Sequence, residues 1–332
     1  MSDIWGRMQK LLQAGQRGIF LIDIDDHPGS TALYGSDLQL LAGRDLASPE
    51  ILEKILRLGE PGLFPSGKGQ VYGELIQPRP ILTILGGGHI AHPLAEIGGI
   101  IGLEVWVVDD RAQFASRQRF PRVEKVVACE YQDFFRGFEL GPEQHLVIVT
   151  RGHRHDLECA REALKTPAHY IGMIGSWRKV NTVNEILSSE GFSREDIDRI
   201  HAPIGLDIGA QSPGEIAVSI GAQLVQKKKR AGDQARWQPI LAALEKGSVL
   251  ATIIQARGST PRGTGASLLL RPDGSLVGTV GGGSGEARVL EKAREVQADG
   301  VPAIMDLDLD QDTAATEGMI CGGSFSVFLQ RI

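Results

Sequence analysis

The chain has 332 residues, of which 42% are hydrophobic and 23% charged, and its formal net charge at pH 7 is −6. This length favours two or three domains over one compact core, and the composition is that of an ordinary globular protein, which excludes a disordered or fibrous chain. The negative charge argues against a nucleic-acid partner, no run approaches the roughly 20 apolar residues of a membrane span, and three cysteines without a C-x-x-C pair indicate a reducing compartment, so we expect a cytoplasmic protein.

The first predicted domain covers residues 1–78 and has an α+β pattern. Trp5 opens it, and the segment LLQAGQRGIFLIDIDDHPGS follows from Leu11 to Ser30. A hairpin-like stretch, ALYGSDLQLLAG, then leads into helix-like sequence and a closing strand, GQVYGELIQ. The segment contains no cysteine and no triple glycine after its hairpin.

The second predicted domain covers residues 79–232, where short β-branched runs alternate with amphipathic stretches. This pattern is typical of a parallel sheet covered by helices. The expected strands are ILTILG, EVWVVDD, KVVAC, HLVIVT and YIGMIG. The last helix is expected to begin at Pro213, with Ser212 as its N-cap and Glu215 placed to complete a capping box.

A glycine turn follows the first strand of this domain. Gly86, Gly88 and Ala91 match the G-x-G-x-x-A pattern, which permits a tight turn, a close approach of the backbone to a pyrophosphate, and close packing of the helix on the strand. The N-terminus of that helix would face an anion, and His89 could either contact the ligand or cap the helix. The turn predicts a central Rossmann-like domain that binds NAD(P) or another nucleotide.

The next strand supplies the acidic partner of this turn. Asp109 and Asp110 end that strand about 20 residues after the glycines, where a carboxylate binds ribose hydroxyls. This placement favours NAD, whereas Arg111 directly after them could bind a phosphate and favour NADP. A structural turn without a ligand is the alternative, because folds persist when their ligands are lost.

Two later strands end at the same predicted edge of the sheet, in TRGHRHD and IGSWRK. The residues expected to bind a second anion there are Gly175, Ser176, Arg178 and Lys179. His153, His155 and Asp156 could form a metal or acid-base site, or they could be loop residues that bond one another and water.

The third predicted domain, residues 233–332, has a second set of glycine turns. The strand VLATIIQ leads into ARGSTPRGTGA, and SLVGTV leads into GGGSGEARVLEKA at a helix start. Such a turn can bind an anion, with charge from an arginine, while Glu286 could bond a ring amide or complement the helix dipole. The residues expected at this site are Arg262, Gly281, Gly282, Gly283 and Glu286.

Cys321 is the candidate reactive thiol. It precedes Gly322 and Gly323 at the start of the closing strand GSFSVFLQR, where backbone N–H groups and little steric cover favour a thiolate. It could serve as a nucleophile, a sulfur carrier or a soft-metal ligand, or be buried filler. Cys129 and Cys159 are expected to be small buried hydrophobic residues.

The two flanking domains resemble each other. LLQAGQRGIFLIDIDDHPGS aligns with LAALEKGSVLATIIQARGST from Leu241 to Thr260, and both segments continue through a hairpin and a helix to a closing strand. The alternative is a chance similarity of two short α+β segments. We predict an α/β protein whose central parallel sheet is flanked by two related α+β segments, the N-terminal one degenerate and without the ligand site.

In the order of these motifs, the sequence resembles the XdhC/CoxI family over nearly the whole chain. The resemblance rests on PRPILTILGGGHIAHPLA, VVDDR, TRGHRHD, YIGMIGSWRK, HAPIGLDIGAQSPGEIAVSI, ARGSTPRGTGA, GTVGGGSGEA and MICGG. In the family the glycine/cysteine domain usually precedes the Rossmann domain, whereas here the complete copy follows it. Ser284 lies where some members carry a cysteine, which leaves Cys321 as the only well-placed thiol.

The resemblance implies an accessory protein for molybdenum hydroxylases such as xanthine dehydrogenase, which binds molybdenum cofactor (molybdopterin), assists its sulfuration and passes it to the apoenzyme. Cys321 would contact the molybdenum or relay sulfur, and the expected partners are the apo-hydroxylase, a sulfurase and a second copy of the chain. A cofactor-handling chaperone is favoured over a turnover enzyme. The alternatives are an NAD(P)-dependent oxidoreductase that uses the central domain, and a scaffold that binds no cofactor.

Overall fold

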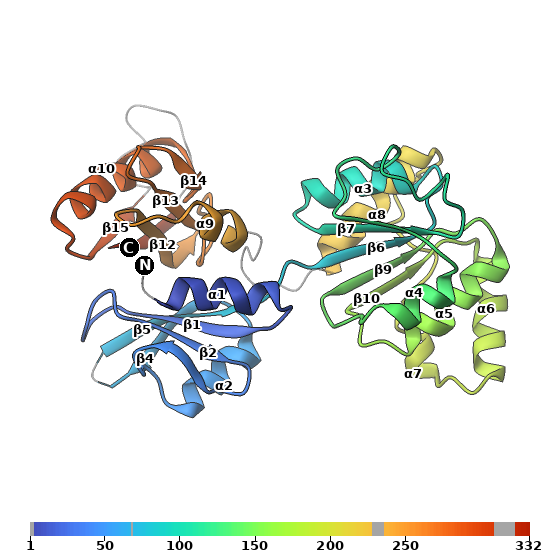
Figure 1. Ribbon diagram of the computed structural model, residues 1–332, viewed down its shortest axis with the longest axis horizontal. Helices are drawn as coiled ribbons and strands as arrows, with labels where there is room; N and C mark the ends of the chain where they lie inside the picture. Colours follow the sequence, from blue (N-terminus) through green and yellow to red (C-terminus); the bar gives the residue numbers. More distant parts are fainter. Residues whose placement is uncertain (1–2, 68, 228–235, 309–322) are drawn as a thin grey trace. The chain divides into compact units, whose positions relative to one another are not determined.

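The computed structural model describes residues 3–67, 69–227, 236–308 and 323–332, which form two compact units (Figure 1). One unit contains the flanking segments 1–78 and 230–332, and the other contains residues 79–229.

The unit formed by residues 79–229 contains one six-stranded sheet. Its strands are β6 (Ile81–Leu85), β7 (Glu104–Asp109), β8 (Lys125–Ala128), β9 (Gln144–Ile148), β10 (Tyr170–Met173) and β11 (Ile200–His201). They pair in parallel in the order β11-β10-β9-β6-β7-β8, which is the Rossmann order of two halves diverging from a central pair. The predicted Rossmann-like parallel sheet is confirmed. Strand β11 was not predicted, because two residues carry no periodic signal.

Helices cover both faces of this sheet. They are α3 (Ala91–Ile100), α4 (Tyr131–Gly137), α5 (His153–Leu164), α6 (Trp177–Ser189), α7 (Arg194–Ile197) and α8 (Pro213–Lys227). One apolar core lies between the sheet and α3 with α8, and another lies under α4, α5 and α6 (Figure 1). The capping box predicted for α8 is present, since Ser212 N–H donates to Glu215 Oε2 at 2.9 Å and Glu215 N–H donates to Ser212 Oγ at 3.3 Å.

The other unit contains two copies of one fold. The first copy has α1 (Asp3–Gln13), β1 (Gly18–Asp23), β2 (Thr31–Gly35), β3 (Leu40–Gly43), α2 (Pro49–Leu58), β4 (Gly62–Ser66) and β5 (Gly69–Ile76). The second has α9 (Trp237–Ala243), β12 (Val249–Gly258), β13 (Ser267–Leu270), β14 (Leu276–Gly278), α10 (Gly283–Asp299), β15 (Ala303–Asp308) and β16 (Gly323–Arg331). Their antiparallel sheets have the corresponding orders β3-β2-β1-β5-β4 and β14-β13-β12-β16-β15, so the predicted relation between the flanking segments is confirmed.

The two copies share one apolar core. The two opening tryptophans, Trp5 and Trp237, have ring centroids 6.3 Å apart, and Phe20 of β1 meets Trp237 edge-on at 5.5 Å. The remaining face of each sheet is covered by its own helix, α2 or α10. Aromatic rings at this spacing stabilise the contact beyond simple burial of their area. Among the described helices, none has the length and apolar character needed to cross a bilayer.

Candidate functional site

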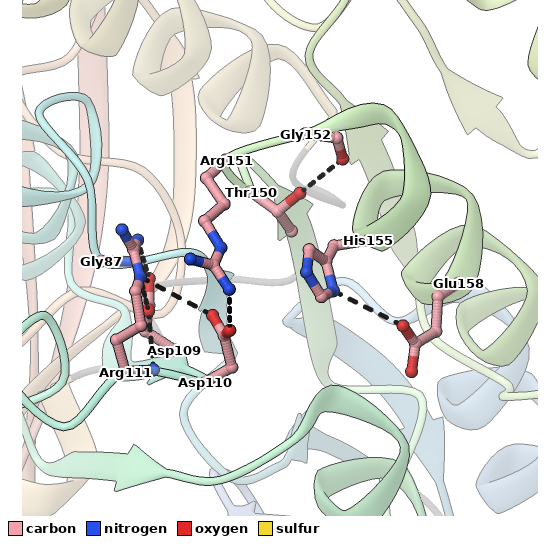
Figure 2. A network of polar contacts seen from close by, with 9 residues as sticks. All are labelled: Gly87, Asp109, Asp110, Arg111, Thr150, Arg151, Gly152, His155 and Glu158. Carbon is pink, nitrogen blue, oxygen red and sulfur yellow. Dashed lines mark hydrogen bonds and ion pairs between the residues drawn. The ribbon is translucent and has the colours of Figure 1, made fainter.

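The carboxyl ends of β6, β7 and β9 meet at one edge of the Rossmann sheet. Strand β6 lies between β7 and β9, and the chain order reverses between β6 and β9, which is where open α/β sheets bind ligands. The glycine turn after β6, the carboxylates that end β7, and Thr150 with Arg151 after β9 come together there (Figure 2).

The three glycines of the turn have different surroundings. Gly86 has a φ of +115°, and a Cβ at this position would lie 2.4 Å from the carbonyl oxygen of Val149. A Cβ on Gly87 would lie 2.2 Å from the carbonyl oxygen of Phe114. A Cβ on Gly88 would have no heavy atom of another part of the chain within 4 Å. Gly86 and Gly87 therefore allow the backbone to pass between β9 and the loop after β7, and Gly88 leaves space for a ligand.

The helix after the turn is placed as the G-x-G-x-x-A pattern predicts. Ala91, the first residue of α3, is fully buried, so the helix packs closely on the sheet. His89 is exposed, and Ile90 rather than His89 occupies the N-cap position without a side-chain hydrogen bond.

The Asp109 carboxylate binds the turn itself. Its side chain is buried, and Oδ2 accepts hydrogen bonds from Gly87 N–H at 2.8 Å and from Arg111 Nη2 at 3.0 Å, while Oδ1 accepts from Arg111 Nε at 2.9 Å. Burial raises the pKa of Asp109, but the hydrogen bonds from Arg111 and Gly87 outweigh this effect and hold the pKa below its usual value. The carboxylate expected to bind ribose is thus ionised and fully engaged by the protein.

Asp110 is neutralised by arginines from two strand ends. Its Oδ2 accepts a hydrogen bond from Arg151 Nη2 at 2.5 Å, and its Oδ1 lies 3.7 Å from Arg111 Nε. Figure 2 shows Asp110 between these two side chains. The edge therefore presents arginine side chains as well as the carboxylates predicted from the sequence.

Arg119 is a site residue that was not predicted. It lies in the loop between β7 and β8, and its Nη2 donates to the carbonyl oxygen of Gly87 at 3.2 Å. The signal available was the number of arginines in RAQFASRQRF, from Arg111 to Phe120, which has no periodic pattern. A loop side chain reaches the turn only through tertiary contacts.

At the second predicted anion site, Lys179 is already paired with a carboxylate of the protein. Lys179 in α6 binds the buried carboxylate of Asp156 through its ammonium, and Thr150 Oγ1 donates to Asp156 Oδ1 at 2.7 Å. Ser176 caps α6 and accepts a hydrogen bond from Lys179 N–H at 3.4 Å, and Arg178 is exposed. Gly175 lies against the Lys179 side chain, since a Cβ there would be 2.9 Å from Lys179 Cδ. Of these residues, Arg178 has its side chain directed toward solvent.

The histidine loop is part of α5 and not an irregular loop. His155 packs on the ring of Tyr131 with centroids 5.5 Å apart, and its Nδ1 lies 3.6 Å from Glu158 Oε2 (Figure 2). Within the described ranges, no group of three or more histidine, cysteine or acidic residues could hold a metal ion.

In the glycine turn of the C-terminal copy, the backbone N–H groups are bound by the side chain of Glu286. Glu286 Oε2 accepts hydrogen bonds from Val280 N–H at 3.0 Å and Gly282 N–H at 3.2 Å, and from the hydroxyl of Thr279. Burial raises the pKa of Glu286, but these hydrogen bonds outweigh it and lower the pKa. Glu286 thus binds the N–H groups expected to bind an anion. Gly281 and Gly283 have positive φ angles in the same turn.

A cavity of about 270 Å³ lies next to this turn. It is lined by Arg236, Pro239, Arg262, Ala266, Ser267, Gly278 and Thr279. Arg262 is exposed at its rim, so the cavity can receive an anionic group. Gly323, the first residue of β16, is buried, while Cys321 and Gly322 lie outside the described residues.

Replacing Asp109 with asparagine tests how the Rossmann turn is held. We expect the free energy of opening of β6 and β7 at pH 7 to fall by about 2 kcal/mol, because a buried charge-assisted hydrogen-bond set is lost. Since the folded-state pKa is lowered, the wild-type contribution is complete above about pH 4 and is lost as the pH falls through the folded pKa. The variant should lack this acid dependence.

Hydrogen exchange of β6 and β7 measured from pH 7 down to about pH 2 covers both effects, because the acid-dependent loss falls below about pH 4. Asp133→Asn is the control, because Asp133 is an exposed carboxylate of the same unit whose side chain is 66% accessible. Equal protection of wild type and Asp109→Asn at pH 7 would show that the carboxylate does not hold the turn.

Two family models match the chain. The XdhC Rossmann domain matches residues 82–224, and the XdhC and CoxI family model matches residues 241–308. The chain belongs to the XdhC and CoxI family. The XdhC Rossmann match runs from β6 into α8 and contains the glycine turn, Asp109 and Arg119, and the XdhC and CoxI match contains Arg262 and the turn bound by Glu286.

Curated relatives match part of this chain. It is 30% identical over 157 residues to a protein of Bacillus subtilis (strain 168) described as a probable xanthine dehydrogenase subunit, covering 47% of this chain and 46% of that protein. It is 29% identical over 154 residues to the "Uncharacterized protein YqeB" of Escherichia coli (strain K12), covering 46% of this chain and 28% of that protein. The matches thus span less than half the length of these relatives.

A solved structure supports the fold. A crystal structure from Bacillus halodurans, described as a xanthine dehydrogenase, aligns with a TM-score of 0.55 and 23% identity over 70% of this chain and 66% of that chain. At this identity the likeness concerns the fold alone.

Proposed function

We propose that this chain is an accessory factor that binds molybdenum cofactor, assists its sulfuration, and delivers it to a molybdenum hydroxylase of the xanthine dehydrogenase type. The observation that carries the proposal is the presence in one chain of an XdhC Rossmann domain and an XdhC and CoxI domain. The similarity to a probable xanthine dehydrogenase component supports the class of client enzyme. On this proposal the molybdenum cofactor is cargo, and the apo-hydroxylase, a sulfurase and a second copy of the chain are partners.

The cavity of the C-terminal copy has chemistry that suits one end of this cargo. A molybdopterin has a phosphate, a pterin ring and a dithiolene that holds the metal. Arg262 at the cavity rim can pair with the phosphate. A volume of about 270 Å³ is just below the usual range for small-molecule sites, which begins at about 300 Å³, so the cavity fits part of the cofactor.

Cys321 is the residue proposed to contact the molybdenum or relay sulfur. It lies in the connection between β15 and β16, outside the described residues, so its role rests on its chemistry and on the family resemblance. The two described cysteines are less suited, because burial raises the pKa of the Cys159 thiol and, more weakly, that of Cys129.

Metal and pterin analysis of protein purified from cofactor-competent cells tests the proposal. We expect molybdenum and pterin to copurify with wild type, and Cys321→Ser to lower the molybdenum content at least about tenfold, as expected for loss of a metal contact. Cys129→Ser is the matched control and should retain the wild-type content. Equal molybdenum in wild type and Cys321→Ser would remove Cys321 from the site, and cofactor-free wild type would refute cargo binding.

A nicotinamide-dependent oxidoreductase is the second candidate. The observation that favours it is the Rossmann strand order, with an open glycine turn at Gly88 beside the point where the order reverses. Oxidation of NADH or NADPH by the purified chain with an added electron acceptor would support this function, and binding of a dinucleotide without hydride transfer would refute it.

A further inference from the structure

Arg119 lies against the glycine turn without a carboxylate partner among the described residues. Its only hydrogen bond there is from Nη2 to the Gly87 carbonyl oxygen, and its Nε is buried with no acceptor. A buried donor without an acceptor is costly, and arginine is the side chain best suited to bind phosphate in two-pronged fashion. The guanidinium is therefore placed to receive an anion at the turn.

Arg119 and a second arginine, Arg111, lie beside one aromatic ring, that of Phe114. The Arg111 guanidinium carbon is 3.7 Å from the centroid of Phe114, and that of Arg119 is 5.2 Å from it. Stacking on a ring restricts both side chains, so less conformational entropy is lost when they bind a ligand. Two like charges gathered on one ring repel each other, and an anion between them removes that repulsion.

The carboxylates of this edge do not cancel the positive charge. Asp109 is hydrogen-bonded by Arg111 and Asp110 Oδ2 by Arg151, while Asp110 Oδ1 is buried 3.7 Å from Arg111 Nε and accepts no hydrogen bond there. Arg111 and Arg151 balance these two charges, and Arg119 then adds one uncompensated positive charge at the turn. His89 is exposed in the same turn.

The engagement of Asp109 also bears on the type of ligand. A carboxylate that reads a ribose diol must accept hydrogen bonds from the two hydroxyls. Both Asp109 oxygens already accept from Gly87 N–H and from Arg111, and the side chain is buried. A free diol at the end of β7 would find no acceptor on Asp109, whereas a phosphate would find arginines.

We propose that Arg119 and Arg111 form a site for a phosphate monoester at the Rossmann edge, and that the ligand is selected by this phosphate and not by a free ribose diol. Two sources carry such a group, the 2′-phosphate of NADP and the phosphate of a molybdopterin. The site belongs to the Rossmann unit and does not require the cargo proposed for the C-terminal copy. The acidic pair after β7 suggests a preference for NAD, whereas a phosphate site at Arg119 and Arg111 favours a ligand that carries a phosphate monoester.

Calorimetric titration of the full chain with NADP⁺, NAD⁺ and molybdopterin tests this site. If NADP⁺ is the source, we expect it to bind at least about tenfold more tightly than NAD⁺, and Arg119→Gln to weaken NADP⁺ binding about tenfold to a hundredfold while NAD⁺ binding is unchanged. If molybdopterin is the source, its binding should show the same dependence on Arg119. Arg119→Lys should retain part of the affinity, because it keeps the charge but not the two-pronged geometry.

Arg122→Ala is the matched control, because Arg122 is an exposed arginine of the same loop. It should leave all affinities unchanged, and circular dichroism checks that each variant is folded. Equal affinity for NAD⁺ and NADP⁺ together with molybdopterin binding that is insensitive to Arg119 would overturn the proposal, as would the absence of binding by all three probes. Arg119-dependent binding of NADP⁺ by a chain that carries no molybdenum would support this site and refute the proposed cargo function.

Discussion

Replacing Glu74 with alanine is expected to lower the free energy of unfolding of the flanking unit by about 3–5 kcal/mol. Glu74 of β5 pairs with Arg236, which directly precedes α9, and their side chains are 1% and 4% accessible. The pair joins the N-terminal copy to the C-terminal copy inside the unit. Removing the carboxylate takes from the buried guanidinium the counter-charge that Glu74 supplies, and this loss inside the core is the source of the large effect.

Replacing both members should cost much less than replacing one. Burial raises the pKa of Glu74 even though the adjacent Arg236 opposes the shift, so the pair does not recover the full cost of taking the charges out of water. Glu74→Leu combined with Arg236→Met is expected to be within about 1 kcal/mol of wild type, or more stable. The pair then serves to match the two copies to each other more than to stabilise them.

Urea dependence of hydrogen exchange in β5 and β12 measures these changes. Glu295→Ala is the control, because Glu295 forms an exposed ion pair with Lys292 in the same unit at 2.7 Å and should contribute less than about 1 kcal/mol. A Glu74→Ala variant as stable as wild type, or a double variant less stable than the single one, would contradict this account.

Replacing Gly86 with alanine is expected to destabilise the Rossmann unit by about 2–4 kcal/mol and to abolish ligand binding at its edge. Gly86 has a φ of +115°, and the added Cβ would lie 2.4 Å from the Val149 carbonyl oxygen. Because that oxygen belongs to the backbone directly after β9, neither partner can move without displacing a central strand. The turn would shift away from Asp109, which binds it through Gly87 N–H.

Gly88→Ala is the control. It shows whether the destabilisation expected for Gly86→Ala is specific to that position or is caused by any side chain added to the turn. Gly88 has no heavy atom within 4 Å of its Cβ position and no positive φ, so its replacement should cost less than about 1 kcal/mol. It would instead reduce ligand affinity if a ligand contacts the open position. Thermal unfolding and NADP⁺ titration of the two variants distinguish these outcomes, and equal destabilisation by both would contradict the structural account of Gly86.

Local sequence was sufficient to predict the elements that position the site. Strands β6, β7 and β9 are runs of β-branched and apolar residues, and α8 carries its own capping box at Ser212 and Glu215, so each is specified by neighbours in the chain. The order of the strands in the sheet was not predicted, because right-handed crossovers fix the hand of each connection and not which strands pair. The relation between the flanking copies was visible because the opening tryptophan and the strand pattern recur.

The partners of the site side chains were not predictable in this way. Asp109 had the spacing of a ribose-binding residue, yet it binds Gly87 N–H and Arg111. Glu286 had the position of a helix-dipole residue, yet it also closes the turn before α10. In both cases the nearest unsatisfied N–H groups decided the outcome, and these are known only once the loops are placed.

The sequence by itself determined the family, the Rossmann-like parallel sheet of the central domain, and the two related flanking folds, because periodicity and glycine spacing are local properties that survive without knowledge of contacts. Only the tertiary structure decided that Trp5 and Trp237 share one core, that Glu74 pairs with Arg236, and that Arg119 reaches the glycine turn. Each of these contacts joins elements from separate parts of the chain. Their energies depend on burial and on the direction of side chains, which the fold as a whole sets.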